Sequence, residues 1–570
     1  MQTPPAASED VAGAGESGDA GSGRVANEAG LAALGEDMHR SVGGRAGRRR
    51  SATRSRRQRL LRRGGLIALA VVLIVVVAGA GFAYYLTHDL HRVKVEGLNS
   101  ALTTGQEAGT ENILMVGSTS RCALSVQNAA FGLCSQGVNG VNSDVIMILH
   151  ADPTHHRLAL LSIPRDLFIP NARTTGPNKI DAGLYQGLTQ LVAAIEEDFG
   201  IPIQHAVSLN FDQFANIVNA LGGINMAFPQ SVFDAESGLN VQAATCVHLD
   251  GFQALAVVRA RHLQYKGDST TTDARYWPQE AQSDLARINR DHEFLRVLSA
   301  AAAKKGLDNP ITDLSLINSL KADLTFDQSW GVHDMVDLIL DFHSININSA
   351  PQLTVPVAVV TDPEGSGGSY VYQGGSYGDV EFPAEPQDQS SVDQVLGVSA
   401  TTDTMTGMPL PAPSSVTVSV MNGTGAANQA ATTAAALGAL GFHTVGVGDI
   451  SPVGDLAETV VYYGSRSSAT EAAAEAVARS MSGAVTMAYD PSRVADGAKV
   501  TVVTGTQFSV NAPAAPATST TAPVATTTPT TSPASGEIAA PSAVNPSLAP
   551  WDPRACPSGA TPTQPVPNKT

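Results

Sequence analysis

The segment from Asn112 to Pro170 decides the fold of this 570-residue chain; it reads NILMVGSTSR at 112–121, NSDVIMILH at 142–150 and LALLSIPRDLFIP at 158–170. Each block holds an apolar run rich in Ile, Leu and Val that is bounded by polar residues. Buried strands have such runs, and their ends deliver polar side chains to the edge of a sheet. The side chains delivered here are Arg121, Asp144, Arg165 and Asp166. Cations and carboxylates in one place predict an oxyanion site with a divalent ion, and phosphate suits both.

Length and composition predict several units rather than one domain. Large apolar residues are almost absent from the first 44 positions, and the end of the chain is mostly Ala, Pro, Thr and Ser, so both ends are expected to be disordered. The predicted units are an Arg-rich cytoplasmic segment at 1–63, a transmembrane helix at 64–86, a connector at 87–111, a large α/β domain at 112–385, a linker at 386–413, a small α/β domain at 414–506 and a disordered tail at 507–570.

Residues 64–86, GGLIALAVVLIVVVAGAGFAYYL, contain no charged side chain. About 20 apolar residues in a helix cross the core of a bilayer, so this segment is predicted to span a membrane. Residues 1–63 hold 12 of the 35 Lys and Arg, all of them Arg, and the positive-inside rule therefore places the N-terminus in the cytoplasm. A cleaved signal peptide is the alternative, although no clear small-x-small site follows the long apolar run. We expect a single-pass protein of the cell membrane whose bulk lies outside the cytoplasm.

All four cysteines follow the predicted membrane helix, where disulfides persist. They are Cys122, Cys134, Cys246 and Cys556. Cys122 and Cys134 bracket a short insert and form the favoured pair, but spacing alone leaves all three pairings open. No C-x-x-C or paired-His spacing occurs, so a zinc site is not expected.

Strands and helices alternate in the rest of the large domain. Apolar residues of 188–195 recur at helical spacing, AVSLNF at 206–211 alternates as a strand does, and FDQFANIVNALGG at 211–223 reads as a helix that two glycines stop. Such alternation is typical of an α/β layered domain. Residues 414–506 repeat it on a smaller scale, from SVTVSVMN to KVTVVTG.

Two arginine motifs could bind an anion. Arg165 and Asp166 follow a predicted strand, where Arg165 would bind a phosphate in bidentate fashion and Asp166 would orient it; a local ion pair that caps a turn is the alternative. Arg259 and Arg261 point to one face if 258–262 is a strand, and their repulsion then calls for an anion between them. A solvated strand edge is the alternative for this second motif.

A third motif places Asp284, Arg287 and Arg290 along one helix face, which an ordinary salt-bridged helix would also do. Together the motifs gather a large share of the arginines in a domain that is otherwise acidic. A pyrophosphate needs several such donors, and Mg²⁺ held by Asp144 would complete its neutralisation. The predicted phosphate-binding set is Arg121, Arg165, Arg259, Arg261, Arg287 and Arg290. No G-x-S-x-G, H-E-x-x-H or Walker sequence occurs, so hydrolase and ATPase readings lack a nucleophile or a phosphate cradle.

The blocks NILMVGSTSR, SDVIMILH, LSIPRDLFIP, KID, FGIPIQHAVSLNFDQFANIVNALGGINM, HLDGFQALAVVRARH and SDLARINRDHEFL follow one another in an order that resembles the LytR-CpsA-Psr family. The similarity covers about 112–300 and extends less clearly to about 360. Residues 414–506, with their V-x-V-x-N-G-x-G start, resemble the C-terminal domain often attached to these proteins in actinobacteria.

This resemblance implies a three-layer α/β/α domain with a central mixed sheet and an apolar pocket for a prenyl chain. It implies a phosphotransferase that moves a glycopolymer from a polyprenyl-pyrophosphate carrier to peptidoglycan, with Mg²⁺ as cofactor and pyrophosphatase activity as a further expectation. The expected partners are the lipid-linked glycopolymer, peptidoglycan and the membrane, without nucleic acid. The implied catalytic residues are Arg165, Asp166, Arg259 and Arg261, and Asp144 matches a metal-binding aspartate.

The chain departs from the family pattern near this site. Gly117-Ser-Thr-Ser-Arg121 stands where the family usually has G-S-D-x-R, and Asn142 stands where it has Arg. Thr119 thus replaces a magnesium-associated aspartate, and one lost carboxylate is matched by one lost guanidinium. Asp291 and His292 replace a usual pair of glutamines. About 20 residues between His262 and Asp284 form an enlarged loop, a candidate for substrate selection.

Two further functions compete with the ligase. A non-catalytic scaffold that binds polyprenyl phosphates or wall polymer is favoured by Thr119 and Asn142. A transcriptional attenuator would need DNA binding by residues 1–63, which show no helix-turn-helix pattern and whose charge membrane orientation explains.

Overall fold

The computed structural model describes residues 91–98, 110–122, 124, 133–137, 139–242, 245–281, 283–306, 324–331, 334–335, 337–338, 350–359, 369–454, 456–513 and 548–563. The predicted cytoplasmic segment and membrane helix, 1–63 and 64–86, lie outside these residues. None of the helices within the described ranges has the length and hydrophobicity needed to span a bilayer.

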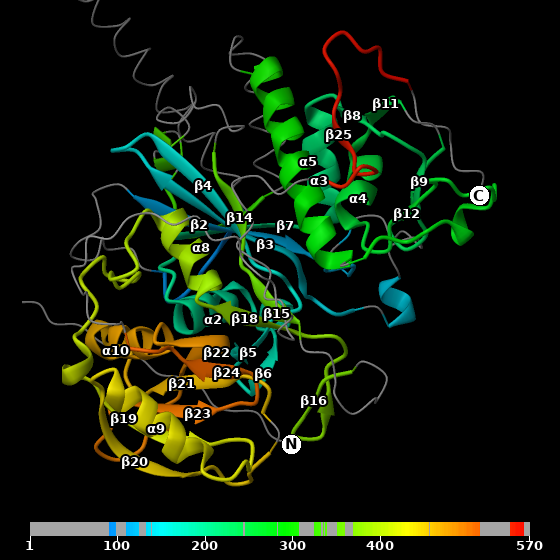
Figure 1. Ribbon diagram of the computed structural model, residues 1–570. Helices are drawn as coiled ribbons and strands as arrows, with labels where there is room; N and C mark the ends of the chain where they lie inside the picture. Colours follow the sequence, from blue (N-terminus) through cyan, green and yellow to red (C-terminus); the bar gives the residue numbers. More distant parts are fainter. Residues whose placement is uncertain are drawn as a thin grey trace, which may run out of the picture. The chain divides into compact units, whose positions relative to one another are not determined.

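A seven-stranded mixed sheet forms the centre of the large domain (Figure 1). Its strands, in spatial order, are β1 (His91–Val93), β13 (Thr325–Asp327), β7 (His205–Leu209), β2 (Glu111–Ser118), β3 (Ser143–Asp152), β4 (Arg157–Ser162) and β14 (Gln352–Thr354). β2, β3 and β4 pair antiparallel, whereas β7 joins β2 and β14 joins β4 in parallel. The three apolar runs that open the domain are therefore neighbouring strands, and the predicted α/β fold with a central mixed sheet is confirmed.

Helices pack on both faces of this sheet because successive side chains of a strand point to opposite faces. Leu114 and Val116 of β2 are buried in a core that includes residues of α2 (Leu188–Phe199) and α8 (Gln387–Leu396). Met115, between them, lines a cavity on the other face together with side chains of α3 (Phe211–Ala220) and α5 (Ser283–Gly306). One face of the sheet is thus a filled core and the other face is partly hollow.

Smaller elements surround the sheet. A hairpin of β5 (Phe168–Arg173) and β6 (Gly176–Lys179) leads to the short helix η3 (Ile180–Gln186). A three-stranded sheet contains β8 (Ile224–Ala227), β11 (Cys246–Leu249) and β25 (Arg554–Ala555), and α4 (Gly251–Arg259) follows β11 in the chain. A second such sheet contains β9 (Val232–Asp234), β10 (Leu239–Val241) and β12 (Gln264–Tyr265), and η4 (Ala274–Tyr276) follows it.

The second large sheet has eight strands and includes the described strands of the predicted small domain at 414–506. Its strands, in spatial order, are β15 (Val357–Val359), β18 (Glu381–Glu385), β22 (Met481–Tyr489), β21 (Thr459–Tyr463), β23 (Val500–Thr504), β19 (Thr417–Asn422) and β20 (His443–Asp449), with β24 (Phe508–Val510) beside β22. The helices α9 (Gln429–Ala439) and α10 (Ser468–Ala478) pack against it. Because β15 and β18 precede residue 386, this sheet extends into the chain assigned to the large domain, whose hairpin β16 (Val371–Tyr372) and β17 (Gly375–Ser376) lies between them in sequence.

The predicted linker and the predicted disordered tail both contain ordered elements. The expected linker 386–413 contains α8, whose Val392 and Val395 are buried in the core of the large domain. The expected disordered tail 507–570 contains β24 and, at 548–563, β25, which pairs antiparallel with β8. A disulfide joins Cys246 to Cys556 in this segment. The tail prediction was wrong there because a few anchoring residues, and not the average composition, hold the segment in place.

Candidate functional site

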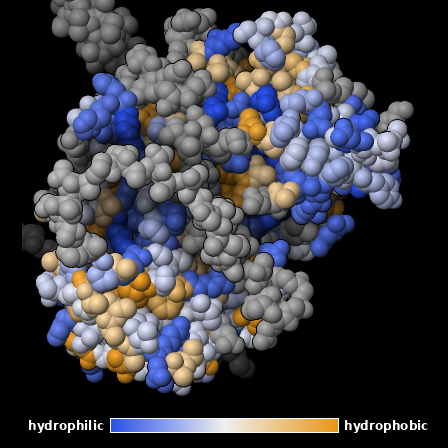
Figure 2. Space-filling view, in the orientation of Figure 1, coloured by the Kyte–Doolittle hydropathy of each residue, from blue (hydrophilic) through white to orange (hydrophobic). Residues whose placement is uncertain are grey.

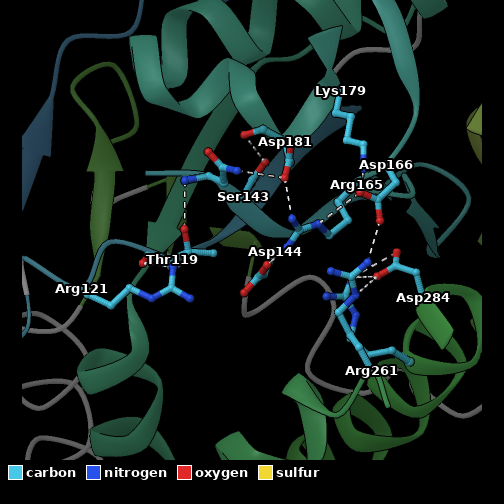
Figure 3. Close-up of polar contacts among 12 residues, drawn as sticks. Thr119, Arg121, Ser143, Asp144, Arg165, Asp166, Lys179, Asp181, Arg261 and Asp284 are labelled. Atoms are coloured by element: carbon cyan, nitrogen blue, oxygen red, sulfur yellow. Dashed lines mark hydrogen bonds and ion pairs between the residues drawn. The ribbon is translucent and has the colours of Figure 1, made fainter. Parts of the chain in front are cut away.

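Arg165 lies at the centre of an ion-pair network beside β3, β4 and β6 (Figure 3). Its guanidinium donates to the Asp144 carboxylate and, over 2.7 Å, to Oδ2 of Asp181. Its Nε lies 3.8 Å from Oδ1 of Asp166, to which Nζ of Lys179 donates over 2.8 Å. The structure therefore brings together Asp144, Arg165 and Asp166 and adds Asp181 and Lys179 to them.

Charges of both signs are held in this network. Burial opposes the charged form of Arg165, but Asp144, Asp181 and Asp166 outweigh burial and raise its pKa above the ordinary value. Burial also favours a higher pKa for Asp166, yet the surrounding cations outweigh it and hold that pKa below the ordinary value. For Asp181 burial dominates and raises the pKa to about 6. Asp181 thus takes up a proton more readily than Asp166.

Arg261 links the network to α5. Its Nη2 donates to Oδ2 of Asp166 over 2.7 Å, and its Nε lies 3.1 Å from Oδ1 of Asp284. Nη2 of Arg287, one turn along α5, lies 3.1 Å from the same Asp284 oxygen. The predicted helix at 284–291 is confirmed, and its Asp284–Arg287 pair is the i, i+3 salt bridge of a helix face.

Residues 258–262 do not form the strand on which a shared face for Arg259 and Arg261 depended. Gly251–Arg259 form α4, and Arg261 lies in the bend that follows the helix. A capping box starts this helix: the Asp250 side chain accepts from the backbone N–H of Gln253, whose side chain accepts from the backbone N–H of Asp250. Arg259 and Arg261 therefore reach the site from a helix end and not from one strand face.

Arg121 and Arg259 both lie over the ring of Phe211. Their guanidinium carbons are 5.6 and 4.6 Å from the ring centroid. Burial lowers the pKa of both arginines, and like charge contributes, from Arg165 at Arg121 and from Arg121 at Arg259. Two partly desolvated cations near one another attract an anion, and a phosphate would relieve their repulsion.

An apolar cavity opens beside these arginines. It has a volume of about 240 Å³, and its wall includes Asp144 and Arg259 as well as apolar side chains of α3, α4 and α5. A second cavity of about 290 Å³ adjoins it. The two share the side chains of Met115, Ile217, Leu295 and Leu298. Figure 2 shows apolar surface near the centre of this face, bordered by hydrophilic surface. The arrangement suits a long apolar chain that carries a charged head.

Arg290 is not brought to this site. It is 0% exposed, and its guanidinium lies 2.6 Å from Glu280 and 3.1 Å from Asp552 and donates to the carbonyl of Ala260. It lies in neither cavity wall. Its predicted phosphate contact is not supported by this placement, because both of its terminal amino groups already donate to internal partners. Arg290 instead joins α5 to the enlarged loop and to the C-terminal segment.

The two residues that depart from the family pattern contact each other. The Thr119 hydroxyl accepts from the backbone N–H of Asn142 over 2.9 Å, and the Thr119 N–H donates to the Asn142 carbonyl over 2.9 Å. The Asn142 amide in turn donates to Oδ2 of Asp181 over 3.1 Å. A carboxylate and a guanidinium at these positions would be neighbours, so their joint replacement removes an ion pair without leaving a buried charge alone.

Asp291 is a residue of the site to which the sequence assigned no role. It is 4% exposed, it lines the cavity that Arg259 and Asp144 also line, and neither carboxylate oxygen has a hydrogen-bond partner among the described residues. Burial raises its pKa to about 7, although Arg287 lies 3.8 Å away. The sequence signal that could have pointed to this residue is the Asp at position 291, where the family pattern usually has Gln.

Asp291→Asn is expected to stabilise the protein at pH 8 and to change little near pH 4. The folded pKa of Asp291 is raised, so its contribution to stability is fully present below the unfolded value of 3.8 and is lost as pH rises through about 7. The loss is on the order of 4 kcal/mol. Urea unfolding of both proteins from pH 4 to 8 measures it, with exposed Asp268→Asn as control. A stability difference independent of pH would contradict this assignment.

Two disulfides lie close to these elements. Cys122 follows Arg121 directly and is bonded to Cys134, as predicted, with a Cα–Cα distance of 5.1 Å. The enlarged loop carries Tyr265, whose ring stacks on Trp551 of the C-terminal segment at a centroid distance of 3.9 Å. The second disulfide joins Cys246 to Cys556, a pairing that sequence spacing alone could not decide. It therefore anchors the same C-terminal segment whose Trp551 packs on the loop.

Residues 82–380 match the LytR_cpsA_psr family, and residues 415–508 match a domain described as the LytR cell envelope-related transcriptional attenuator. The first match alone covers more than half of the chain. This chain belongs to the LytR_cpsA_psr family. The resemblance inferred from the seven sequence blocks is therefore confirmed, and so is the C-terminal domain.

Curated relatives share the same part of the chain. A probable cell wall biosynthesis protein, LcpB of Corynebacterium glutamicum, is 31% identical over 265 residues, which is 46% of this chain and 58% of LcpB. A polyisoprenyl-teichoic acid–peptidoglycan teichoic acid transferase, TagU of Halalkalibacterium halodurans, is 28% identical over 193 residues, 33% of this chain and 57% of TagU. The chain thus spans less than two thirds of the length of either relative.

Solved structures of the family also align with it. A LytR-Csp2A-Psr enzyme from Actinomyces oris aligns with 48% of this chain and 90% of its own, at 24% identity and a TM-score of 0.37. TagV of B. subtilis aligns with 52% of this chain and 100% of its own, at 19% identity and a TM-score of 0.38.

Proposed function

We propose that this protein is a membrane-anchored phosphotransferase that moves a glycopolymer from a polyprenyl-diphosphate carrier to peptidoglycan. One observation carries the proposal: Arg259 and Asp144 line the same cavity as the apolar side chains of α3, α4 and α5. An apolar chamber with charged groups at its wall matches a lipid chain with a diphosphate head. The transferase names of the relatives support the same reaction class.

The reaction is an exchange of one P–O bond for another. An acceptor hydroxyl oxygen attacks the phosphorus that bears the glycopolymer, the bond from this phosphorus to the bridging oxygen breaks, and polyprenyl phosphate leaves with the bond's electron pair. Arg121 and Arg259 would bind the diphosphate, while Arg165 and Arg261 would stabilise the charge on the transferred phosphoryl group. Asp291, a buried carboxyl with a pKa of about 7, would take the hydroxyl proton. Asp166 would position Arg165 and Arg261.

Mg²⁺ fits this site only together with the substrate. Among the described residues, no group of three or more His, Cys, Asp or Glu side chains is arranged to hold a metal ion. Phosphate-bound Mg²⁺ needs only one or two protein carboxylates, because phosphate oxygens and waters complete its six ligands. We propose that Asp144 supplies that carboxylate. When bound, the ion would neutralise negative charge on the diphosphate.

The lipid bound by the native protein tests the proposed donor class. Mass spectrometry of protein purified from membranes in mild detergent is expected to detect a polyprenyl phosphate or diphosphate in near-stoichiometric amount. Protein that carries only ordinary phospholipid, and that does not take up added polyprenyl diphosphate, would contradict the proposal.

Filling the cavity is expected to weaken donor binding. Ile217 belongs to both cavity walls, so Ile217→Trp would occupy the space of part of the prenyl chain. Each buried methylene contributes about 0.8 kcal/mol, so loss of two weakens binding by roughly tenfold. Titration with a fluorescent polyprenyl diphosphate measures the affinity, with Ile217→Leu as the volume-matched control. Equal affinities of the Trp and Leu variants would show that the chain binds elsewhere.

The exchange at positions 119 and 142 supports the second candidate, a non-catalytic scaffold that binds the lipid. In the double variant Thr119→Asp/Asn142→Arg, a restored carboxylate is expected to raise Mg²⁺ affinity on the order of tenfold, because affinity follows the number of charged ligands. The new guanidinium would compensate the charge. Calorimetric titration with Mg²⁺ measures the affinity of the native chain and of the double variant, and turnover of the diphosphate donor is measured for both. Turnover that appears only in the double variant would establish the scaffold, and magnesium-dependent turnover of the native chain would exclude it.

A further inference from the structure

A polar groove lies apart from the arginine network and the apolar cavities. It has a volume of about 530 Å³ and shares no lining residue with the two cavities. Three tyrosines, Tyr372, Tyr462 and Tyr489, stand in its wall, together with Arg173 of the β5–β6 hairpin and Arg466. We call it the tyrosine groove. In size it falls within the range of about 300–1,000 Å³ of small-molecule sites.

Hydrogen bonds between the large domain and the small domain hold the walls of the groove together. The carboxylate of Glu197, in α2, lies 2.5 Å from Nη2 of Arg466 and accepts from the Asn171 amide over 2.9 Å. The same amide donates to the carbonyl of Tyr489 over 3.4 Å, and the Tyr463 hydroxyl donates to the carbonyl of Glu197 over 3.3 Å. Figure 1 shows β5 and β6 beside β22, as these contacts require. The walls are therefore held in place before any ligand binds.

Guanidinium groups fix the tyrosine rings. Arg466 lies over Tyr489 at 3.8 Å from the ring centroid, and Arg493 lies over Tyr462 at 5.1 Å. Glu197 neutralises Arg466, and Asp490 neutralises Arg493 over 3.2 Å. The walls thus combine oriented aromatic rings with paired charges. Such walls do not suit an apolar ligand, and the two wall carboxylates oppose a polyanion.

Arg173 and polar side chains supply hydrogen bonds in the groove. The Arg173 Nε is buried without a hydrogen-bond partner among the described residues, so a bound hydroxyl or amide oxygen would satisfy it. Thr174, Thr175 and Gln190 also line the groove and can both donate and accept. Tyrosine faces are electron-rich and attract the C–H-bearing faces of sugar rings. Hydroxyl partners, amide partners and aromatic platforms together recognise an uncharged saccharide chain.

The β5–β6 hairpin connects the groove to the arginine network. β5 begins two residues after Asp166, and Lys179 at the end of β6 donates to Asp166 over 2.8 Å. The opposite end of the hairpin, with Arg173, lies in the groove wall. Six residues of strand span about 20 Å. A ligand that reaches from the groove to the arginine network must therefore be a chain of several sugars.

We propose that the tyrosine groove binds the glycan strand of the acceptor and holds it while a distant sugar of the same strand reaches the arginine network. This inference rests on the proposed function for the identity of the strand, an N-acetylated hexosamine polymer. Binding itself does not depend on turnover.

Calorimetric titration of the full-length protein in detergent with soluble oligomers of N-acetylglucosamine, which are uncharged N-acetylated hexosamine strands, tests the groove. The native chain is expected to bind them, and Tyr372→Leu and Arg173→Gln are each expected to weaken binding about tenfold. Tyr372→Phe keeps the ring and is expected to bind as the native chain does. Tyr276→Leu, which removes a 75% exposed tyrosine outside the groove, is the matched control. Thermal unfolding of every variant checks its fold.

Absence of strand binding, or equal binding by all folded variants, would overturn the inference. So would binding of an anionic phosphate polymer in the groove without binding of the uncharged strand. Donor cleavage by the native chain is measured in parallel. Groove-dependent strand binding without donor cleavage would support the groove and count against the proposed transferase, whereas donor cleavage without strand binding would do the reverse.

Discussion

Arg165→Ala is expected to lower the turnover of the diphosphate donor by at least about 100-fold, the loss typical when one donor to transition-state charge is removed. Arg165 contacts Asp144, Asp166 and Asp181, so its removal also leaves three carboxylates without their common cation. Breaking a buried ion pair from one side costs about 3–5 kcal/mol of stability. The variant should therefore unfold at a lower urea concentration and turn over slowly even where it is folded.

The controls separate these two effects. Arg165→Lys keeps a cation without the planar fork and is expected to recover stability more than turnover, because a point charge cannot form the paired hydrogen bonds. Arg92→Ala removes an arginine that donates to the Gln328 carbonyl, away from the network, and should leave turnover unchanged. Native turnover by folded Arg165→Ala would remove this residue from the reaction.

Cys556→Ser is expected to lower the free energy of unfolding by about 2–5 kcal/mol, the usual result of removing a native disulfide. The Cys246–Cys556 bond closes a separation of 310 residues and holds β25 against β8. Its loss would also weaken the contact of Asp552 with Arg290, which would leave that buried guanidinium with Glu280 as its carboxylate partner. Urea unfolding under non-reducing conditions measures the change.

Cys246→Ser breaks the same bond and should have the same effect, and the double variant should be no less stable than either single variant. Cys122→Ser breaks the other disulfide, between Cys122 and Cys134, and leaves the Cys246–Cys556 bond intact. Peptide mapping by mass spectrometry reads the pairing directly. Recovery of Cys556 as a free thiol from the native protein would contradict the fastening of the C-terminal segment.

Local patterns revealed the strands and several helices in advance. The apolar runs of β2, β3 and β4 and the helical spacing of α2 and α3 are properties of short segments, so the sequence alone contains them. The start of α4 was predictable in principle as well, because Asp250 and Gln253 have the spacing of a capping box. The i, i+2 spacing of Arg259 and Arg261 is equally compatible with a strand, so that spacing alone could not identify the helix.

Long-range pairing could not be predicted in the same way. Arg290 has the helix position of a phosphate ligand but meets Asp552 from 262 residues away. Asp181 and Lys179 enter the network because the β5–β6 hairpin turns back on Asp166, and no local spacing expresses that return. Asp291 and Arg259 line the same cavity because of the way α4 and α5 pack together, which local spacing likewise does not express.

The most direct test of the central claim is a transfer assay with the full-length protein in detergent. The donor is a polyprenyl diphosphate that carries a short saccharide, and the acceptor is a peptide-free peptidoglycan strand. We expect release of one polyprenyl phosphate for each saccharide phosphate attached to the strand, dependent on Mg²⁺ and lost in Arg165→Ala. The account would be contradicted if the native protein binds the donor but releases polyprenyl phosphate no faster than Arg165→Ala does, with or without Mg²⁺.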